Sequence, residues 1–250
     1  MTPGHAEQDR AHHDAVAPHY DELVNTPRDV LSSMIFAKAA KYLPVRSARM
    51  LDLGAGTGHM ASRFGDRFES VVLVDHSEGM LARARENLRF LGTRATFVRE
   101  DVIAYVESSA DRFDLVACVG VLHHLAPDEL RRLLSGVVRR MTAGGAFIFA
   151  EPVGTEASEP TLVRRWNAPR LPELGRYLEL APPPEEEMLD RGATKTMLAE
   201  LNLRLVYERR AWELYARYSG NFVDRLAIRA IDALCHRAGM IWFGVARISA

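Results

Sequence analysis

One stretch decides the fold: Met50-Leu51-Asp52-Leu53-Gly54-Ala55-Gly56-Thr57-Gly58-His59. Its apolar residues predict a short strand, and three alternate glycines then lead into a helix expected over Thr57 to Phe64. Glycine permits sharp turns and lets a ligand approach backbone N–H groups, so this turn is typical of nucleotide binding. A dinucleotide fingerprint needs G-x-G-x-x-G, whereas Gly58 comes one residue early and His59 replaces the last glycine. No Lys-Ser/Thr pair follows, which excludes a triphosphate cradle.

Two carboxylates accompany this turn. Asp52, just before it, would repel a pyrophosphate but suits a cationic ligand that carries an ammonium and a sulfonium. The next predicted strand, Ser70 to Asp75, ends in an acid 21 residues beyond Gly54, where a carboxylate can reach two ribose hydroxyls. Together these residues resemble motifs I and II of the class I S-adenosylmethionine-dependent methyltransferases. The resemblance implies S-adenosylmethionine as cofactor and S-adenosylhomocysteine as its product.

Two further segments match in the same order. Asp101 and Val102 follow a predicted strand, and the resemblance implies that they contact the adenine ring, although Asp101 could instead cap the helix Val102 to Glu107. Phe113 to Val119, followed by Leu122-His123-His124-Leu125, resembles the FD-x-V…L-H-H-L signature of the small-molecule branch, which has a core like that of the ubiquinone and menaquinone methyltransferases.

The resemblance extends to the N-terminal segment. Ala17-Pro18-His19-Tyr20-Asp21 resembles an A-x-x-Y-D segment that folds over the cofactor, although Tyr20 could equally pack the helix onto the sheet. The expected cofactor-binding residues are Tyr20, Asp52, Gly54, Ala55, Gly56, Thr57, Asp75, His76, Met80, Asp101, Val102, Cys118 and Val119.

Candidates for a general base lie on the same predicted rim: His123, His124, His19 and Glu151. His123 is the first choice because it follows the fourth strand and because histidine titrates near neutral pH. The alternative is that the histidine pair only shapes the pocket. His5, His12 and His13 invite a metal interpretation, but without structured partners we expect them to be solvated and predict no metal site.

From Arg49 onward, strands alternate with helices, which predicts a parallel sheet with right-handed crossovers. The expected fold class is α/β, a doubly wound, seven-stranded, Rossmann-like methyltransferase sheet in the order 3-2-1-4-5-7-6, with strand seven antiparallel and helical insertions forming a lid. The strands after the first are expected at 70–75, 95–99, 113–119, 146–150, 203–210 and 241–248.

The domain plan is an N-terminal helical lid at 1–45 and a methyltransferase domain at 46–250, with insertions at about 153–193 and 212–239. We expect Met1 to about Ala11 to be mobile and Thr26 to cap a helix that has Pro27 in its first turn.

Aromatic side chains in the insertions are candidates for an acceptor pocket: Trp166, Tyr177, Trp212 and Tyr218. The second insertion carries an apolar stripe that consists of Phe222, Leu226, Ala230 and Leu234. We expect this stripe to pack against the domain; a dimer face and a basic membrane-surface helix are the alternatives.

Composition narrows the function. The 250 residues carry a net charge of −1, which gives no general attraction to nucleic acid or to anionic membranes. Two cysteines, Cys118 and Cys235, form neither a disulfide framework nor a metal site. The N-terminus lacks the apolar core of a signal peptide, and no run of about 18 apolar residues occurs. We therefore expect a cytoplasmic monomer or homodimer without membrane insertion.

The sequence thus predicts methyl transfer to an O, N or C atom of a small, apolar or aromatic metabolite. An RNA or protein methyltransferase on the same core is an alternative, which would need a basic path such as Arg164, Arg165 and Arg170. A second alternative keeps the fold and binds the cofactor without methyl transfer. An NAD-dependent oxidoreductase is excluded by the glycine spacing.

Overall fold

The computed structural model describes residues 3–44, 47–154, 158–172, 175, 179, 188–215 and 221–249. Seven strands form one sheet in the order β3-β2-β1-β4-β5-β7-β6. Their bounds are β1 (Ser47–Leu53), β2 (Phe68–Asp75), β3 (Ala95–Arg99), β4 (Phe113–Val119), β5 (Met141–Pro152), β6 (Leu203–Ala211) and β7 (Ile241–Ile248). β1 to β5 pair in parallel, and β7 is antiparallel to both β5 and β6. The predicted fold class and strand order are confirmed.

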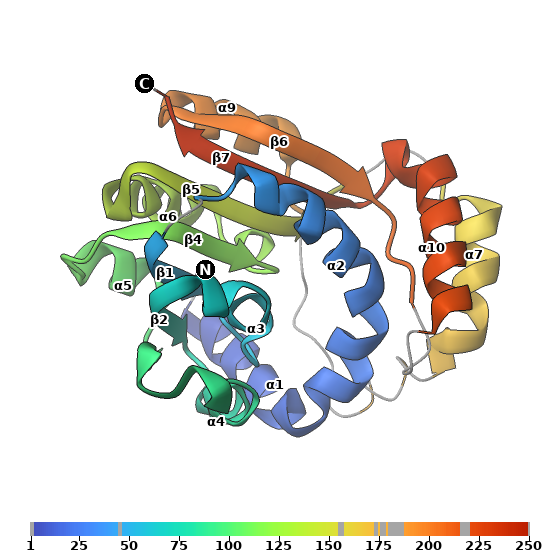
Figure 1. Cartoon of the computed structure of the whole chain (residues 1–250), viewed down its shortest axis with the longest axis horizontal. Helices are drawn as coiled ribbons and strands as arrows, with labels where there is room; N and C mark the ends of the chain where they lie inside the picture. Colours follow the sequence, from blue (N-terminus) through green and yellow to red (C-terminus); the bar gives the residue numbers. More distant parts are fainter. Residues whose placement is uncertain are drawn as a thin grey trace.

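The described helices cover both faces of this sheet (Figure 1). They are α1 (Pro3–Tyr20), α2 (Thr26–Ala39), α3 (His59–Phe64), α4 (Glu78–Asn87), α5 (Val102–Ser108), α6 (Pro127–Arg140), α7 (Thr161–Asn167), α9 (Arg191–Glu200) and α10 (Phe222–Cys235). Successive strand residues point to opposite faces, so Met50 enters the core that α2 and α3 cover, whereas Leu51 enters the core that α5, α6 and α9 cover. Both faces are apolar, as parallel sheets require.

The N-terminal segment is helical almost throughout. Residues from Pro3 onward belong to α1, and a π-helical turn, Asp21–Asn25, leads directly into α2. The residues from Pro3 to Ala11 are helical, and their mobility stays a prediction. The predicted cap at Thr26 is wrong, because Asn25 precedes α2 and is itself in the helical region. An ordered α1 is explained by its buried face, on which Val16 and Ala17 pack against Met80 of α4.

The predicted stripe on α10 does not face the core. Phe222, Leu226 and Leu234 are 77%, 58% and 78% exposed, and Phe222 and Leu226 line an open groove of about 900 Å³ between α2 and α10. The buried face instead carries Ile228 and Ile231 together with two acids, as described next. The prediction that this stripe packs against the domain is therefore wrong.

Two ion pairs explain which face of α10 is buried. Asp232 accepts a hydrogen bond from Arg209 of β6, and Asp224 lies 3.8 Å from Arg170. Arg170 also lies over the ring of Trp166, 4.3 Å from its centroid. Buried charges require partners, and both acids have an arginine.

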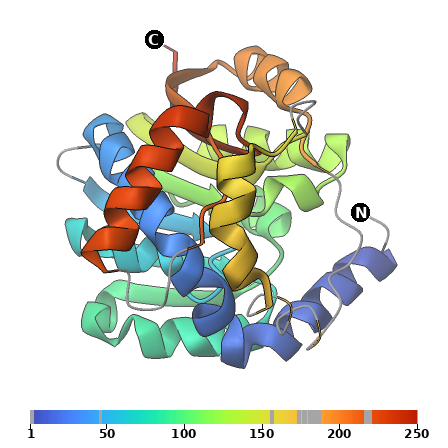
Figure 2. The same ribbon diagram turned by 90° about the vertical axis from the view of Figure 1, so that its right-hand side faces the viewer.

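The insertions place α7 and α10 side by side, next to the ends of β5 and β6 (Figures 1 and 2). Trp166 is half-buried and donates its indole N–H to the carbonyl of Tyr215 at 2.9 Å. Trp212 belongs to the buried core, while Tyr177 and Tyr218 lie outside the described residues. Among the helices that the structure describes, none combines the length and the apolar character needed to cross a membrane.

Candidate cofactor site and active site

The glycine turn after β1 adopts a backbone that other residues rarely adopt. Gly54, Gly56 and Gly58 have φ values of +62°, +52° and +87°, in the left-handed region that favours glycine. The Ala55 N–H donates to the carbonyl of Val74 at 3.0 Å, which ties the turn to β2. The three glycines are therefore required by the backbone itself.

Asp75 holds the turn from the end of β2. Its Oδ2 accepts from the N–H of Gly56 and its Oδ1 from the N–H of Ser77, both at 2.8 Å. β1 and β2 are neighbours in the sheet, with Leu53 paired to Val74. The two acids of the motif thus lie at the ends of adjacent strands, and Asp75 fixes the loops that follow both.

Asp52 is buried below the turn. It is 2% exposed and accepts a hydrogen bond from the Ala61 N–H at 3.1 Å. Burial raises the pKa of the Asp52 carboxyl to about 8, and the nearby charge of Asp75 adds to the effect. Without a cation beside it, Asp52 is therefore mainly protonated at neutral pH.

This proton makes the stability of the ligand-free protein depend on pH. The pKa of this carboxyl is near 4 in the unfolded chain and about 8 in the folded protein. Between these two pH values the folded state therefore holds more protons than the unfolded state. The free energy of unfolding falls as pH rises through this range, by at most about 1.4 kcal/mol per pH unit. Asp52→Asn, which keeps an acceptor for Ala61, should remove this dependence. Urea unfolding of both proteins from pH 5 to 9 measures it, and parallel curves would contradict it.

The adenine-side candidates have structural roles of their own. Asp101 Oδ1 accepts from the N–H groups of Ile103 and Ala104, both at 2.9 Å, so it caps α5 as the alternative interpretation required. Val102 is buried in the first turn of α5. Contact of either residue with adenine stays a prediction. Cys118 is fully buried in the core, and burial raises the pKa of its thiol well above the usual range.

α1 spans the two loops that Asp75 joins. Asp14 Oδ1 accepts from the Ser77 hydroxyl at 2.6 Å and from the Gly79 N–H at 3.0 Å. Seven residues later, at the start of the π-helical turn that follows α1, Asp21 accepts from the Thr57 hydroxyl. The sequence analysis did not identify Asp14 and Asp21 as contacts of these loops, although a spacing of seven residues is typical of one helical face. Tyr20 packs against Val16, Ala17 and Met80, between α1 and α4 rather than on the sheet, and its contact with the cofactor stays a prediction.

The fourth and fifth strands bring two catalytic candidates together. Glu151, fully buried on β5, accepts from His123 Nδ1 at 2.7 Å and from the backbone N–H of Val121 at 3.1 Å. A carboxylate can only accept, so Nδ1 carries a proton, and the neutral imidazole then has its lone pair on Nε2. This arrangement holds an imidazole in the form that a general base needs.

The other two candidates differ. The rings of His123 and His124 lie 4.0 Å apart, and His124 Nδ1 is 3.7 Å from Asp9 Oδ1 of α1. His19 is exposed on the last turn of α1. The structure therefore groups His123, His124 and Glu151 at the carboxyl ends of β4 and β5. His19 is not part of this group. The glycine turn is beside the group, since a Cβ at Gly54 would lie 2.3 Å from Val121 Cγ2.

The strand order and the glycine turn define a doubly wound α/β protein of the nucleoside-binding kind. Residues 50–145 match the model of the methyltransferase domain family. The chain is 33% identical over 142 residues to the malonyl-[acyl-carrier protein] O-methyltransferase of Geobacter sulfurreducens, covering 54% of this chain and 49% of that one. It is 28% identical over 145 residues to the carboxy-S-adenosyl-L-methionine synthase of Campylobacter concisus, covering 56% and 60%.

A solved structure is similar over the whole chain. The structure called the DhpI-SAH complex superposes with a TM-score of 0.66 at 14% identity, covering 100% of this chain and 99% of that one. The chain spans about half the length of the curated relatives it matches. Residues 50–145 thus match a methyltransferase domain, and the strand order is the one that the resemblance to the class I S-adenosylmethionine-dependent methyltransferases predicted.

Proposed function

We propose that the protein transfers a methyl group from S-adenosylmethionine to an O, N or C atom of a small, apolar or aromatic metabolite. The observation that carries this proposal is the buried Glu151–His123 pair beside the glycine turn. It puts an oriented imidazole next to the glycine turn, which lies within the matched methyltransferase domain and to which the resemblance assigns the cofactor. A base of this kind serves an acceptor that arrives protonated, such as a phenol or an alcohol.

The residues of the chain would divide the work between binding and proton transfer. Asp75 and the glycine turn would hold the ribose and the methionine portion, and Asp52 would become a carboxylate beside the positive groups. A bound S-adenosylmethionine supplies an activated methyl group, so the protein mainly has to align the acceptor, which contributes about 7–11 kcal/mol. His123 Nε2 would take the acceptor proton, and Glu151 would stabilise the resulting imidazolium.

The ribose role of Asp75 has a direct test. Asp75→Ala should weaken S-adenosylmethionine binding by about 1.5–3 kcal/mol, the value of hydrogen bonds to a charged group. Isothermal titration calorimetry measures this, with NAD as a ligand expected to give no heat. Asp66→Ala, at an exposed acid just before β2, is the matched control. An affinity unchanged by Asp75→Ala would remove Asp75 from this role.

The acceptor can be sought directly. Incubation with isotopically labelled methyl donor and a panel of phenols, amines and enols should label a small molecule, as read by mass spectrometry. Label found only in added RNA or protein would favour the macromolecular alternative. Against that alternative, Arg170 is already occupied by Trp166 and Asp224.

The relative named as a carboxy-S-adenosyl-L-methionine synthase gives one specific reason to keep a second candidate. In that case the cofactor itself would be modified rather than consumed as a methyl donor. The same mass spectrometry experiment separates the two, because methyl transfer releases S-adenosylhomocysteine and modification of the cofactor does not.

A further inference from the structure

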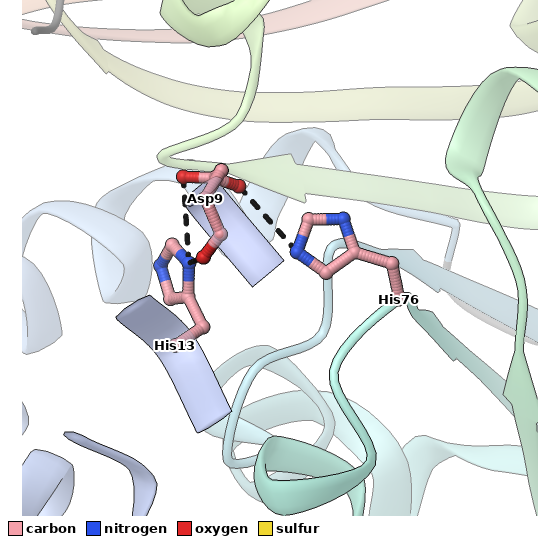
Figure 3. Close-up of side chains that lie close together, drawn as sticks. All are labelled: Asp9, His13 and His76. Carbon is pink, nitrogen blue, oxygen red and sulfur yellow. Dashed lines mark hydrogen bonds and ion pairs between the residues drawn. The ribbon is translucent and has the colours of Figure 1, made fainter. Parts of the chain in front are cut away.

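A cluster of histidines and one acid joins α1 to the end of β2. Asp9 and His13 lie one turn apart on α1, and His76 follows the last residue of β2 (Figure 3). One carboxylate oxygen of Asp9 and one ring nitrogen of each histidine lie within 4.8 Å of one another. The cluster therefore combines residues far apart in the sequence into one potential ligand set.

Two distances in this cluster match those between neighbouring ligands of a metal ion. Asp9 Oδ1 is 3.5 Å from His13 Nδ1, and Asp9 Oδ2 is 3.4 Å from His76 Nε2. Ligands at about 2.0–2.2 Å around a tetrahedral ion stand roughly 3.3–3.6 Å apart. His13 Nδ1 also donates to the Asp9 carbonyl at 2.9 Å. Binding through Nδ1 would replace that hydrogen bond, and binding through Nε2 would keep it.

The buried charge of the Asp9 carboxylate also favours binding of a cation. The Asp9 side chain is 6% exposed, and among the described residues its Oδ1 accepts no hydrogen bond. Its ion pairs in the described chain are with His13, His76 and His124. A buried carboxylate oxygen without a hydrogen-bond donor is costly, and a metal ion would remove that cost.

The expectation that His12 and His13 are solvated is wrong, whereas the burial of His5 lies outside what the structure describes. His12 is 5% exposed and the side chain of His13 is 24% exposed. The sequence could not reveal this burial, because His76 and His124 follow β2 and β4 and come close to α1 only in the folded protein.

We propose that Asp9, His13 and His76 bind a divalent transition-metal ion of the zinc class. Two imidazoles and one carboxylate favour Zn²⁺, Fe²⁺, Co²⁺ or Ni²⁺ over Mg²⁺ and Ca²⁺, which prefer oxygen ligands. His124, with Nδ1 3.7 Å from Asp9 Oδ1, offers a fourth ligand. The bound ion fastens α1 across the loop that begins at Asp75. This inference does not rest on the proposed methyl transfer.

The test uses the full chain, freed of metal by a chelator and without S-adenosylmethionine. Titration with ZnCl₂ should show a single ion bound per chain and a higher midpoint of thermal unfolding. Co²⁺ should give the visible d–d absorption of a protein-bound ion. Since no cofactor is present, failure of the proposed function leaves this result unaffected.

Variants locate the ion. His13→Ala and His76→Ala should each weaken Zn²⁺ binding by more than about tenfold, and Asp9→Asn should do so without changing side-chain size. His19→Ala, an exposed histidine on the same helix, should bind Zn²⁺ like the wild type. The proposal is overturned if the wild type gives neither zinc heat nor cobalt absorption, or if the three variants retain wild-type affinity. Circular dichroism of each metal-free variant checks its folding.

Discussion

His123→Ala is expected to lower turnover by about 10²–10⁴-fold while leaving S-adenosylmethionine affinity nearly unchanged. The reason is that Nδ1 of this ring is held by Glu151 at 2.7 Å, which leaves Nε2 to accept the proton. Loss of a positioned general base lowers the rate by a factor of this size. Single-turnover rates with an identified acceptor, together with calorimetric cofactor affinity, measure the two quantities. His236→Ala, in the turn that follows α10, serves as the control histidine.

Glu151→Gln separates a base from a residue that only shapes the pocket. The amide keeps the size of the side chain but removes the negative charge that stabilises an imidazolium. Turnover should therefore fall, and the acid side of the pH–rate profile should move to lower pH. If His123→Ala reduces turnover less than about tenfold and the profile of Glu151→Gln does not move, His123 is a pocket residue.

Gly54→Ala is expected to cost about 2–5 kcal/mol of folding stability and to abolish cofactor binding. The left-handed backbone at φ +62° costs a residue with a Cβ about 1–2 kcal/mol. The added Cβ would also lie 2.3 Å from Val121 Cγ2, and such overpacking costs roughly 1–3 kcal/mol. Urea unfolding and calorimetry measure the two losses.

Gly56→Ala is the matched stability control. It has nearly the same φ, +52°, but its Cβ would have no neighbour within 4 Å. Its cost should therefore be the backbone part alone, about 1–2 kcal/mol. Adding Val121→Ala to Gly54→Ala should recover the steric part. Equal losses for the two glycine variants would show that contact with Val121 is unimportant.

The sheet could be predicted because its strands are apolar runs bounded by turn residues. The bounds predicted for β3, β4 and β7 agree with the structure, whereas β5 begins earlier, at Met141. The glycine turn and its two acids could be located because their chemistry is local in sequence. Their contact with a cofactor stays a prediction.

What the sequence did not reveal depends on contacts between distant segments. The buried face of α10 is set by Arg170 and Arg209, which neutralise Asp224 and Asp232, and apolar periodicity cannot detect such pairs. The same holds for Asp9, because its histidine neighbours include residues from the ends of two strands. Charge pairing across the fold therefore decides the parts that hydrophobic patterns miss.

The position of β7 between β5 and β6 has a consequence for biosynthesis. β5 pairs with β4 on one side and with β7 on the other. β6 is synthesised before β7 but pairs with β7 rather than with β5. The second edge of β5 therefore stays unpaired on the ribosome until Ile241–Ile248 has been made. During that interval the nascent chain presents the apolar residues 146–150 along an unpaired edge, which is prone to aggregation. Chaperones should therefore engage the growing polypeptide most strongly after β5 and release it once β7 inserts.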